Sequence, residues 1–211
     1  LFAGVGSQTQ ALKNLGIEHE VIGISEIDPY AIKSYNAIHG ETHNFGDITK
    51  IDMLPYADLW TYSFPCQDLS VAGKQAGIKE GTRSGLLLEV ERLLEVSEKP
   101  KYLLLENVKN LVGKKFRPDF ERWLGRLKEL GYHNYWKVLN AKDYGVPQNR
   151  ERVFVVSIRK DVDNGYVFPS KQVLTKRLKD VLESSVNEKY YLKGDKALSL
   201  LSDIVTKNKI S

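Results

Sequence analysis

Cysteine is almost absent from this chain, in which Cys66 is the only one among 211 residues. A single cysteine excludes an internal disulfide and a zinc site built from cysteine pairs. The four histidines, at positions 19, 39, 43 and 133, lack the spacing of metal ligands, so we expect no metal. We also find no signal peptide, membrane-spanning run or low-complexity segment, which favours a cytoplasmic protein with no membrane partner.

The overall composition is that of an ordinary globular protein. A length of 211 residues, with 42% hydrophobic and 27% charged residues, is enough for one domain with a full core. The net charge of +4 is compatible with a polyanionic partner, but a mildly basic protein without such a partner fits equally well. The chain begins at Leu1, without methionine and inside a strand-like run, so we expect that an N-terminal piece is missing.

Strand-like and helix-like patterns alternate along most of the chain. Residues 7–15 and 29–39 read as helices, the second with Asp28 as N-cap and Gly40 as its stop. Further strands are predicted at 20–27, 58–64, 101–105, 135–139 and 152–158, and further helices at 84–98 and 116–130. The last two strands could form a hairpin at one edge.

This order predicts an α/β fold of the Rossmann-like type, with a mostly parallel sheet and helices on both faces. We place this domain at residues 1–160. Beyond it, the strand signal fades, and residues 161–211 contain too few apolar residues for a second core. We interpret this last segment as a connector toward a further domain.

Cys66 stands in a polar loop directly after a predicted buried strand. Pro65 cannot donate a hydrogen bond to a sheet, so the strand should end there. A free thiol, with a pKa near 8.5, is a good nucleophile only where its surroundings favour the thiolate. From this loop alone, a nucleophile and an inert thiol are equally good interpretations.

A glycine-rich turn between a strand and a helix indicates a ligand site near the N-terminus. Gly4 and Gly6 allow the backbone to approach a ligand close to the positive end of a helix. Thr9 stands where a dinucleotide fingerprint has its third glycine, which argues against a pyrophosphate ligand. Glu26, at a strand end, would accept the hydroxyls of a ribose. Asp47 would accept an adenine amino group, with Ile48 against the ring.

Charged residues also follow the later strands. Glu106 comes directly after the buried run 102–105, so it should emerge at the carboxyl edge of the sheet, where α/β proteins bind ligands. Arg150 and Arg152 stand at alternate positions before a strand, which puts both guanidinium groups on one face. Surface salt bridges at these positions are the plain alternative.

With these residues in view, the chain resembles the cytosine-C5 DNA methyltransferases over residues 1–158. The resemblance rests on seven ordered motifs: Phe-x-Gly-x-Gly at 2–6, Glu26, Gly-Asp-Ile at 46–48, Phe-Pro-Cys-Gln at 64–67, Arg-Ser-Gly-Leu at 83–86, Glu-Asn-Val at 106–108 and Gln-x-Arg-x-Arg at 148–152. It implies methyl transfer from S-adenosylmethionine to cytosine C5 in duplex DNA, with S-adenosylhomocysteine as product and no metal.

The resemblance also implies roles for single residues. Cys66 would add to cytosine C6 while Glu106 contacts N3, Arg152 binds the O2 carbonyl and Arg150 holds the loop and the intermediate. The base must leave the duplex for this attack. The implied cofactor residues are Phe2, Ala3, Gly4, Val5, Gly6, Glu26, Ile27, Asp47, Ile48, Pro65 and Leu86. The implied DNA contacts are Gln67, Ser70, Lys74 and Gln148.

Two departures from the family pattern stand out. Ser63 replaces the usual glycine before Phe-Pro-Cys-Gln, a small change. Family members also carry a target-recognition domain and two final motifs beyond the last matched strand. We expect the full-length protein or a partner chain to supply them, and we expect the 211 residues alone not to methylate DNA.

Other interpretations remain open. The same chemistry on tRNA, a cofactor-binding scaffold without catalysis, and a dinucleotide oxidoreductase are the alternatives. We favour a monomeric bacterial or phage enzyme, with double-stranded DNA and a cognate restriction endonuclease as its expected partners.

Overall fold

The computed structural model describes residues 1–65 and 84–206. It divides into two compact units, Leu1–Leu174 and Thr175–Ser211, and each is described by itself. The predicted boundary at residue 160 and the connector role of the last segment remain predictions. No helix in the described ranges has the length and apolar character needed to cross a membrane.

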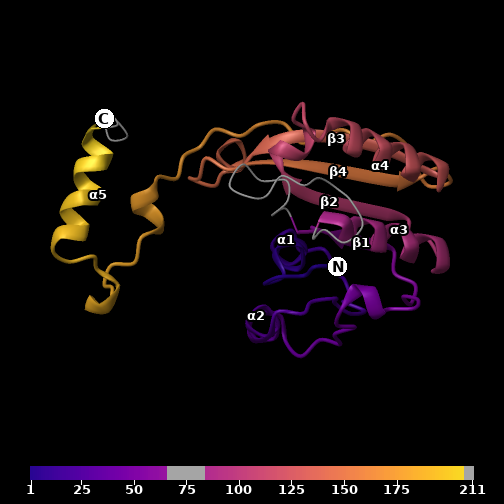
Figure 1. Cartoon of the computed structure of the whole chain (residues 1–211), viewed down its shortest axis with the longest axis horizontal. Coiled ribbons are helices and arrows are strands. Elements are labelled where there is room, and N and C mark those ends of the chain that lie inside the picture. The colour runs from indigo at the N-terminus through magenta and orange to yellow at the C-terminus, as the bar shows by residue number, and fades with distance from the viewer. Residues whose placement is uncertain (66–83, 207–211) are drawn as a thin grey trace. The chain divides into compact units, whose positions relative to one another are not determined.

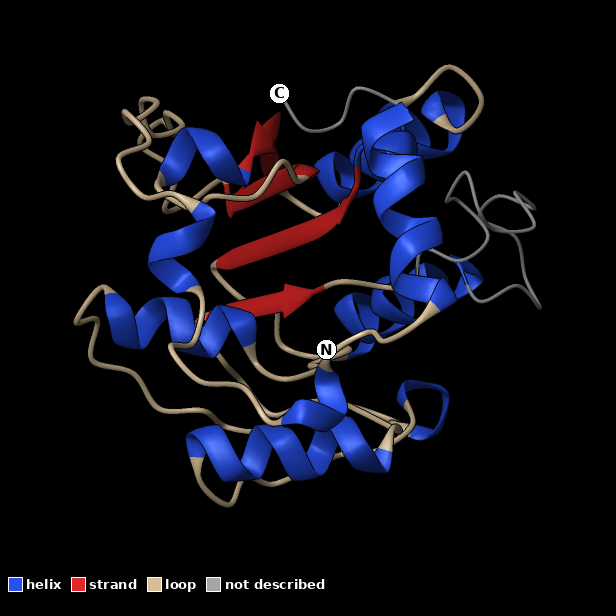
Figure 2. Cartoon of the chain, turned by 90° about the vertical axis from the view of Figure 1, so that its left-hand side faces the viewer, coloured by secondary structure: helices blue, strands red, loops and turns tan. Residues whose placement is uncertain are grey.

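One four-stranded sheet forms the centre of the first unit (Figures 1 and 2). Its order is β1-β2-β4-β3, with strands β1 (Leu59–Tyr62), β2 (Tyr102–Val108), β3 (Tyr132–Asn140) and β4 (Glu151–Arg159). β1 pairs with β2 in parallel, whereas β4 runs antiparallel to both β2 and β3. The α/β class is therefore confirmed, and so is the predicted hairpin of the last two strands at one edge.

The N-terminal part is less regular than predicted. Helices α1 (Ser7–Asn14) and α2 (Pro29–His39) form where expected, and Asp28 caps α2 by accepting from the Tyr30 N–H at 2.8 Å. The strand predicted at 20–27 is wrong in extent, because only an isolated parallel bridge joins Ile24 to Asn44.

Two further helices cover the sheet. α3 (Leu87–Val96) and α4 (Arg117–Glu129) bury apolar side chains that include Leu93 and Phe120. Arg126 on α4 forms ion pairs with Glu91 and Glu95 of α3, so the two helices lie side by side. Short 3₁₀ turns complete the unit: η1 (Ile48–Lys50), η2 (Ser84–Leu86), η3 (Lys109–Val112) and η4 (Ala141–Tyr144).

A buried polar pair lies inside this core. Trp123 of α4 donates its indole N–H to the Tyr62 hydroxyl at 3.1 Å, and both side chains are almost fully buried. Burial raises the pKa of Tyr62 far above its ordinary value, so the hydroxyl stays neutral. The core therefore fixes β1 from its helical side, directly before the loop that carries the predicted nucleophile.

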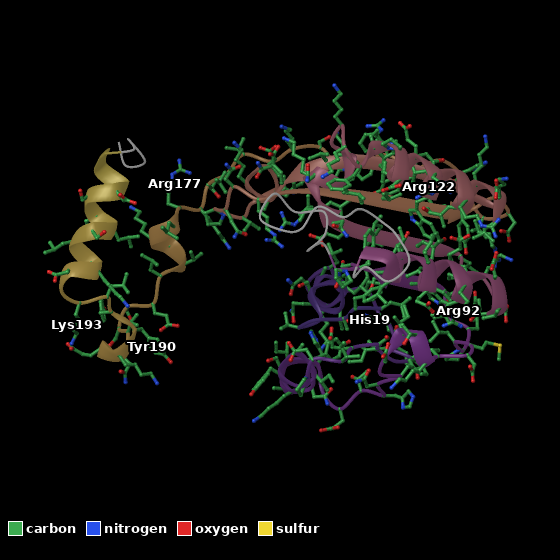
Figure 3. All side chains as sticks on the ribbon, in the orientation of Figure 1. His19, Arg92, Arg122, Arg177, Tyr190 and Lys193 are labelled. Atoms are coloured by element: carbon green, nitrogen blue, oxygen red, sulfur yellow. The ribbon has the colours of Figure 1, made fainter. Side chains whose placement is uncertain are left out.

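The second unit consists of η5 (Leu178–Val181), η6 (Glu188–Tyr190) and α5 (Asp195–Thr206). Its large apolar side chains are mostly exposed, including Tyr190, whose ring lies under the Lys189 ammonium (Figure 3).

Candidate active site

The end of β2 meets the start of β4 at a charged pair. The antiparallel register pairs Glu106 with Phe154 and Val108 with Arg152, which puts Glu106 and Arg152 on one face as diagonal neighbours. Arg152 Nε lies 3.1 Å from Glu106 Oε1, and each side chain is about a quarter exposed. Two of the predicted catalytic residues are thus brought into direct contact.

A small cavity opens beside this pair. Its volume is about 250 Å³, and it is lined by Ser63, Phe64, Pro65, Glu106, Asn107, Val108, Arg150 and Arg152. Because β1 and β2 are parallel, the segment that follows β1 reaches the same sheet edge as Glu106. The structure therefore collects Glu106, Arg150, Arg152 and Pro65, all predicted site residues, around one hollow.

Asn107 ties the two sides of this cavity together. Its side chain is 3% exposed, and its Nδ2 donates to the Phe64 carbonyl oxygen at 3.0 Å. This bond fixes the backbone one residue before Pro65. The sequence interpretation treated Asn107 only as part of a motif, although an amide inside an apolar strand is itself a signal of a buried polar bond.

Four predicted residues lie outside the described ranges: Cys66, Gln67, Ser70 and Lys74. Gln148, the remaining predicted DNA contact, is exposed in the loop before β4, and its backbone N–H donates to the Val146 carbonyl at 2.7 Å. The roles of all five remain predictions.

The glycine turn has an unusual backbone. Phe2, Gly4 and Gly6 have φ values of 56°, 54° and 79°, in the left-handed region that favours glycine. For Phe2, this conformation is strained, as is common at ligand-binding loops. Gly6 is the N-cap of α1, and this helix has no side-chain cap bond at its start.

The Glu26 carboxylate binds the backbone of this turn and of the two residues that follow Glu26. Its Oε2 accepts from the Gly4 N–H at 2.8 Å, while Oε1 accepts from the N–H groups of Ile27 at 2.8 Å and Asp28 at 3.0 Å. A carboxylate offers about four lone-pair positions, and these bonds use three. In this conformation, Glu26 has room for one hydroxyl of a ribose, and accepting both would release one backbone bond.

Asp47 stands at the start of η1. Its Oδ1 accepts from the Thr49 N–H at 3.0 Å and hydroxyl at 2.9 Å, and these bonds hold the pKa of Asp47 below its usual value. Arg92, labelled in Figure 3, fixes the same turn by donating to the carbonyls of Ile48 and Ile51. Asp47 is therefore an ionised hydrogen-bond acceptor on a turn that Arg92 holds in place.

The apolar residues predicted to contact the cofactor differ in exposure. Ile27 and Val5 are exposed, at 69% and 50%. Leu86 is half-buried against the core, and Ile48 is 3% exposed, so its side chain belongs to the core. Ile27 and Val5 thus offer the most apolar surface of these four residues.

Two residues beside the glycine turn were missed by the sequence interpretation. His39 at the end of α2 has its Nε2 3.1 Å from the Val5 carbonyl oxygen, and Tyr35 one turn earlier bonds Thr9 Oγ1 at 2.9 Å. A carbonyl only accepts, so this nitrogen of His39 carries the proton. The available signal was their helical spacing of four, which puts both on one face of α2.

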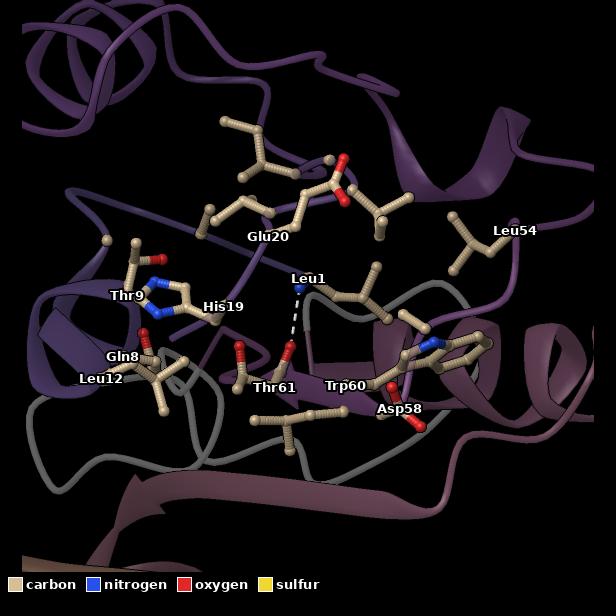
Figure 4. A pocket seen from close by; sticks show the side chains of 18 of the residues that line it. Leu1, Gln8, Thr9, Leu12, His19, Glu20, Leu54, Asp58, Trp60 and Thr61 are labelled. Carbon is tan, nitrogen blue, oxygen red and sulfur yellow. Dashed lines mark hydrogen bonds between the residues drawn. The ribbon is translucent and has the colours of Figure 1, made fainter. Parts of the chain in front are cut away.

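A larger cavity, of about 510 Å³, lies elsewhere (Figure 4). Of the predicted cofactor residues, only Ala3 and Gly6 line it. The backbone nitrogen of Leu1 lies here and donates to the Thr61 carbonyl at 2.7 Å. We assign no ligand to this cavity, since Glu26 and Asp47 are not in its wall.

Comparison with known proteins places this geometry in a family. The family model of the C-5 cytosine-specific DNA methylases matches residues 1–210. The chain belongs to this family. Among curated members, the type II methyltransferase M2.ScrFI of Lactococcus lactis subsp. cremoris is 42% identical over 92% of the chain and 69% of its own length. The orphan methyltransferase M.SPRI of Bacillus phage SPR is 39% identical over 98% of the chain and 54% of its own length.

Solved structures share the fold of this C-5 cytosine methylase chain. The Dnmt2 methyltransferase of S. pombe superposes with a TM-score of 0.74 at 22% identity, over 96% of the chain and 64% of that structure. The EhMeth methyltransferase of Entamoeba histolytica gives 0.75 at 20% identity, over 97% and 62%. The chain thus spans between about half and about two thirds of the length of these relatives.

Proposed function

We propose that the full-length protein transfers a methyl group from S-adenosylmethionine to C5 of cytosine in a specific sequence of duplex DNA. The observation that carries this proposal is the cavity in which Glu106, Arg150 and Arg152 surround the end of the Phe64–Pro65 segment, with Cys66 next in the chain. Membership of the C-5 cytosine-specific DNA methylase family supports the same reaction.

The reaction needs a nucleophile because C5 of cytosine is too weakly nucleophilic to take the methyl group directly. In our proposal, the Cys66 thiolate forms a bond to C6, and a proton shared between Glu106 and N3 balances the electron pair that moves into the ring. C5 would then take the methyl group as the bond between that group and the cofactor sulfur breaks. Solvent water would accept the C5 proton, the electrons left behind would re-form the C5–C6 double bond and expel the Cys66 thiolate, and the proton on N3 would return to Glu106. The base must be turned out of the duplex to enter the cavity.

The arginines serve the base and the loop in this proposal. Arg152, held by its ion pair with Glu106, has further guanidinium N–H groups that can donate to the O2 carbonyl of cytosine. Arg150 lines the same cavity from the exposed loop before β4 and would hold the nucleophile loop over the base.

The residues around the glycine turn suit S-adenosylmethionine. This cofactor, when bound, supplies a methyl group on a positively charged sulfur. Glu26 has a lone-pair position left for a ribose hydroxyl, and the ionised Asp47 suits an adenine amino group. The negative charge of both carboxylates also favours a cationic ligand.

The biological setting is proposed from relatives. Type II and orphan methyltransferases of bacteria and phages are among them, so we propose a monomeric cytoplasmic enzyme of a restriction-modification or solitary system. A cognate restriction endonuclease would be its partner in the first case. Gln67, Ser70, Lys74 and Gln148 are the proposed DNA contacts.

Covalent trapping tests the reaction. The full-length gene product is incubated with S-adenosylmethionine and duplex DNA that contains 5-fluorocytosine, whose fluorine cannot leave as the C5 proton does. We expect a cofactor-dependent adduct on a denaturing gel. Cys66→Ser should abolish it, and Lys114→Ala, an exposed residue that does not line the cavity, serves as a control that keeps it.

Failure of this test has a clear meaning. A protein that binds S-adenosylmethionine but forms no adduct with a diverse DNA pool contradicts the proposal, and labelled methyl transfer to tRNA would then show an RNA substrate. An adduct that survives Cys66→Ser would overturn the assignment of the nucleophile.

A further inference from the structure

The loop that carries Arg150 joins the two strands of the edge hairpin. It runs from the end of β3 through η4 and Gly145, whose φ of 84° turns the chain, and returns to β4. Ladder bonds hold Arg152, since it lies inside β4 and pairs with Leu139 and Val108. Arg150 precedes β4 and is exposed, so its position depends on the loop itself.

One side chain closes this loop. Asn140 Oδ1 accepts from the backbone N–H of Arg150 at 3.1 Å and from that of Lys142 at 3.3 Å. Its Nδ2 donates to Asn149 Oδ1 at 2.7 Å. One amide therefore bonds the first turn of the loop and both of its last two residues.

One backbone hydrogen bond within the described residues also holds Arg150. The Ala141 N–H donates to the Arg150 carbonyl at 3.0 Å, which fixes the peptide group after Arg150. The bond that the Arg150 N–H donates to Asn140 fixes the peptide group before it. Together, the two bonds set the direction in which the Arg150 side chain leaves the backbone toward the cavity it lines.

We propose that Asn140 is a positioning residue for the methyl transfer, acting through Arg150 by holding its backbone N–H. The role rests on the proposed function, but the bond itself can be tested without it. An Asn140 that merely capped η4 would need only the bond to Lys142. The added bonds to Arg150 and Asn149, ten and nine residues along the chain, extend its reach to the arginine.

Two substitutions separate acceptor from donor. Asn140→Ala removes all three bonds. Asn140→Asp keeps an oxygen for the Arg150 and Lys142 N–H groups, and the Asn149 amide can rotate to donate to it. Asn187→Ala is the matched control, because Asn187 caps η6 in the second unit by the same side-chain bond, to the Lys189 N–H at 3.0 Å.

The experiment uses the full-length protein. Steady-state methyl transfer to DNA gives kcat and the KM for S-adenosylmethionine, and amide hydrogen exchange reports protection of the Arg150 N–H. For Asn140→Ala, we expect kcat to fall about 10- to 100-fold, the size of effect that a misplaced site group produces, with little change in KM. The Arg150 amide should exchange faster. Asn140→Asp should restore both, and Asn187→Ala should change neither.

Three results would overturn the inference. One is an active wild-type protein whose kcat is unchanged by Asn140→Ala. A second is an Asp variant as impaired as the Ala variant, since the acceptor would then be irrelevant. The third is unchanged protection of the Arg150 amide. If the wild-type protein methylates no DNA, the proposed function fails, and the exchange measurement still decides whether Asn140 holds Arg150.

Discussion

The two halves of the candidate site are held in place by different means. Glu106 and Arg152 lie in a continuous antiparallel ladder that runs from the pair Tyr102–Ile158 to the pair Val108–Arg152. The glycine turn lies outside the four-stranded sheet, and separate bonds hold it: the Gly4 N–H donates to Glu26, His39 donates to the Val5 carbonyl, and the Ala3 N–H donates to the Ser25 carbonyl at 3.2 Å. Many hydrogen bonds hold a ladder together, so the positions of Glu106 and Arg152 should tolerate the loss of one contact. The glycine turn should depend on each.

The largest effect is expected from the chemistry of the cavity, not from its architecture. Glu106→Gln keeps the size and ladder position of the side chain but removes the group that exchanges a proton with the base. We expect kcat to fall about 10²- to 10⁴-fold, the usual contribution of a general acid or base. Single-turnover methyl transfer measures this, with S-adenosylmethionine affinity as the control. A rate within tenfold of wild type would contradict the assigned role.

We expect Gly6→Ala to distort the glycine turn without removing any group that reacts or binds the ligand. A Cβ on Gly6 would lie 2.5 Å from His39 Nε2 and 2.6 Å from Tyr35 Cε2, and its φ of 79° disfavours any side chain. We expect at least a tenfold loss of S-adenosylmethionine affinity, about 1.4 kcal/mol, measured by calorimetry. Gly125→Ala is the matched control, since its Cβ meets nothing within 4 Å in α4 and alanine favours the helix. Equal affinities for both variants would refute the argument.

The sequence predicts the cavity better than the turn, for a physical reason. Strands β2 and β4 are apolar runs whose ends carry the charged residues, so the pattern alone could place Glu106 at the carboxyl edge of the sheet and Arg150 and Arg152 on one face of their strand. Period-two alternation sets which face a side chain takes. The 3.1 Å contact between Glu106 and Arg152 depends on the antiparallel register, which the pattern does not contain.

Residues that act across the fold were not predictable. Asn107 reaches back 43 positions to Phe64, and His39 reaches back 34 to Val5. Such pairs follow from packing, which no local periodicity encodes. The strand expected at 20–27 has the right alternation, but only Ile24 finds a bridge partner. Alternation indicates which residues suit a strand, but it does not show whether another strand lies beside them to pair with.

His39 allows a finer test of how the glycine turn is held. His39→Gln can still donate to the Val5 carbonyl, whereas His39→Phe keeps the ring against Tyr35 but has no donor. We expect the Phe variant to lose a few-fold in S-adenosylmethionine affinity, because a neutral hydrogen bond contributes about 1 kcal/mol. The Gln variant should stay near wild type. If Gln loses more than Phe, the ring packing rather than the bond holds the turn.

The smallest effect should come from a surface pair on the ladder side. Lys109 Nζ lies 2.9 Å from Glu151 Oε2 at the start of β4, and the two side chains are 57% and 45% exposed. Exposed pairs of this kind contribute at most about 1 kcal/mol, and salt screens them. Lys109→Ala should therefore lower the free energy of unfolding by less than that in urea titrations, and less still at high salt. A larger, salt-independent loss would mean that this pair, and not the ladder, holds the start of β4, and the contrast between the two halves would disappear.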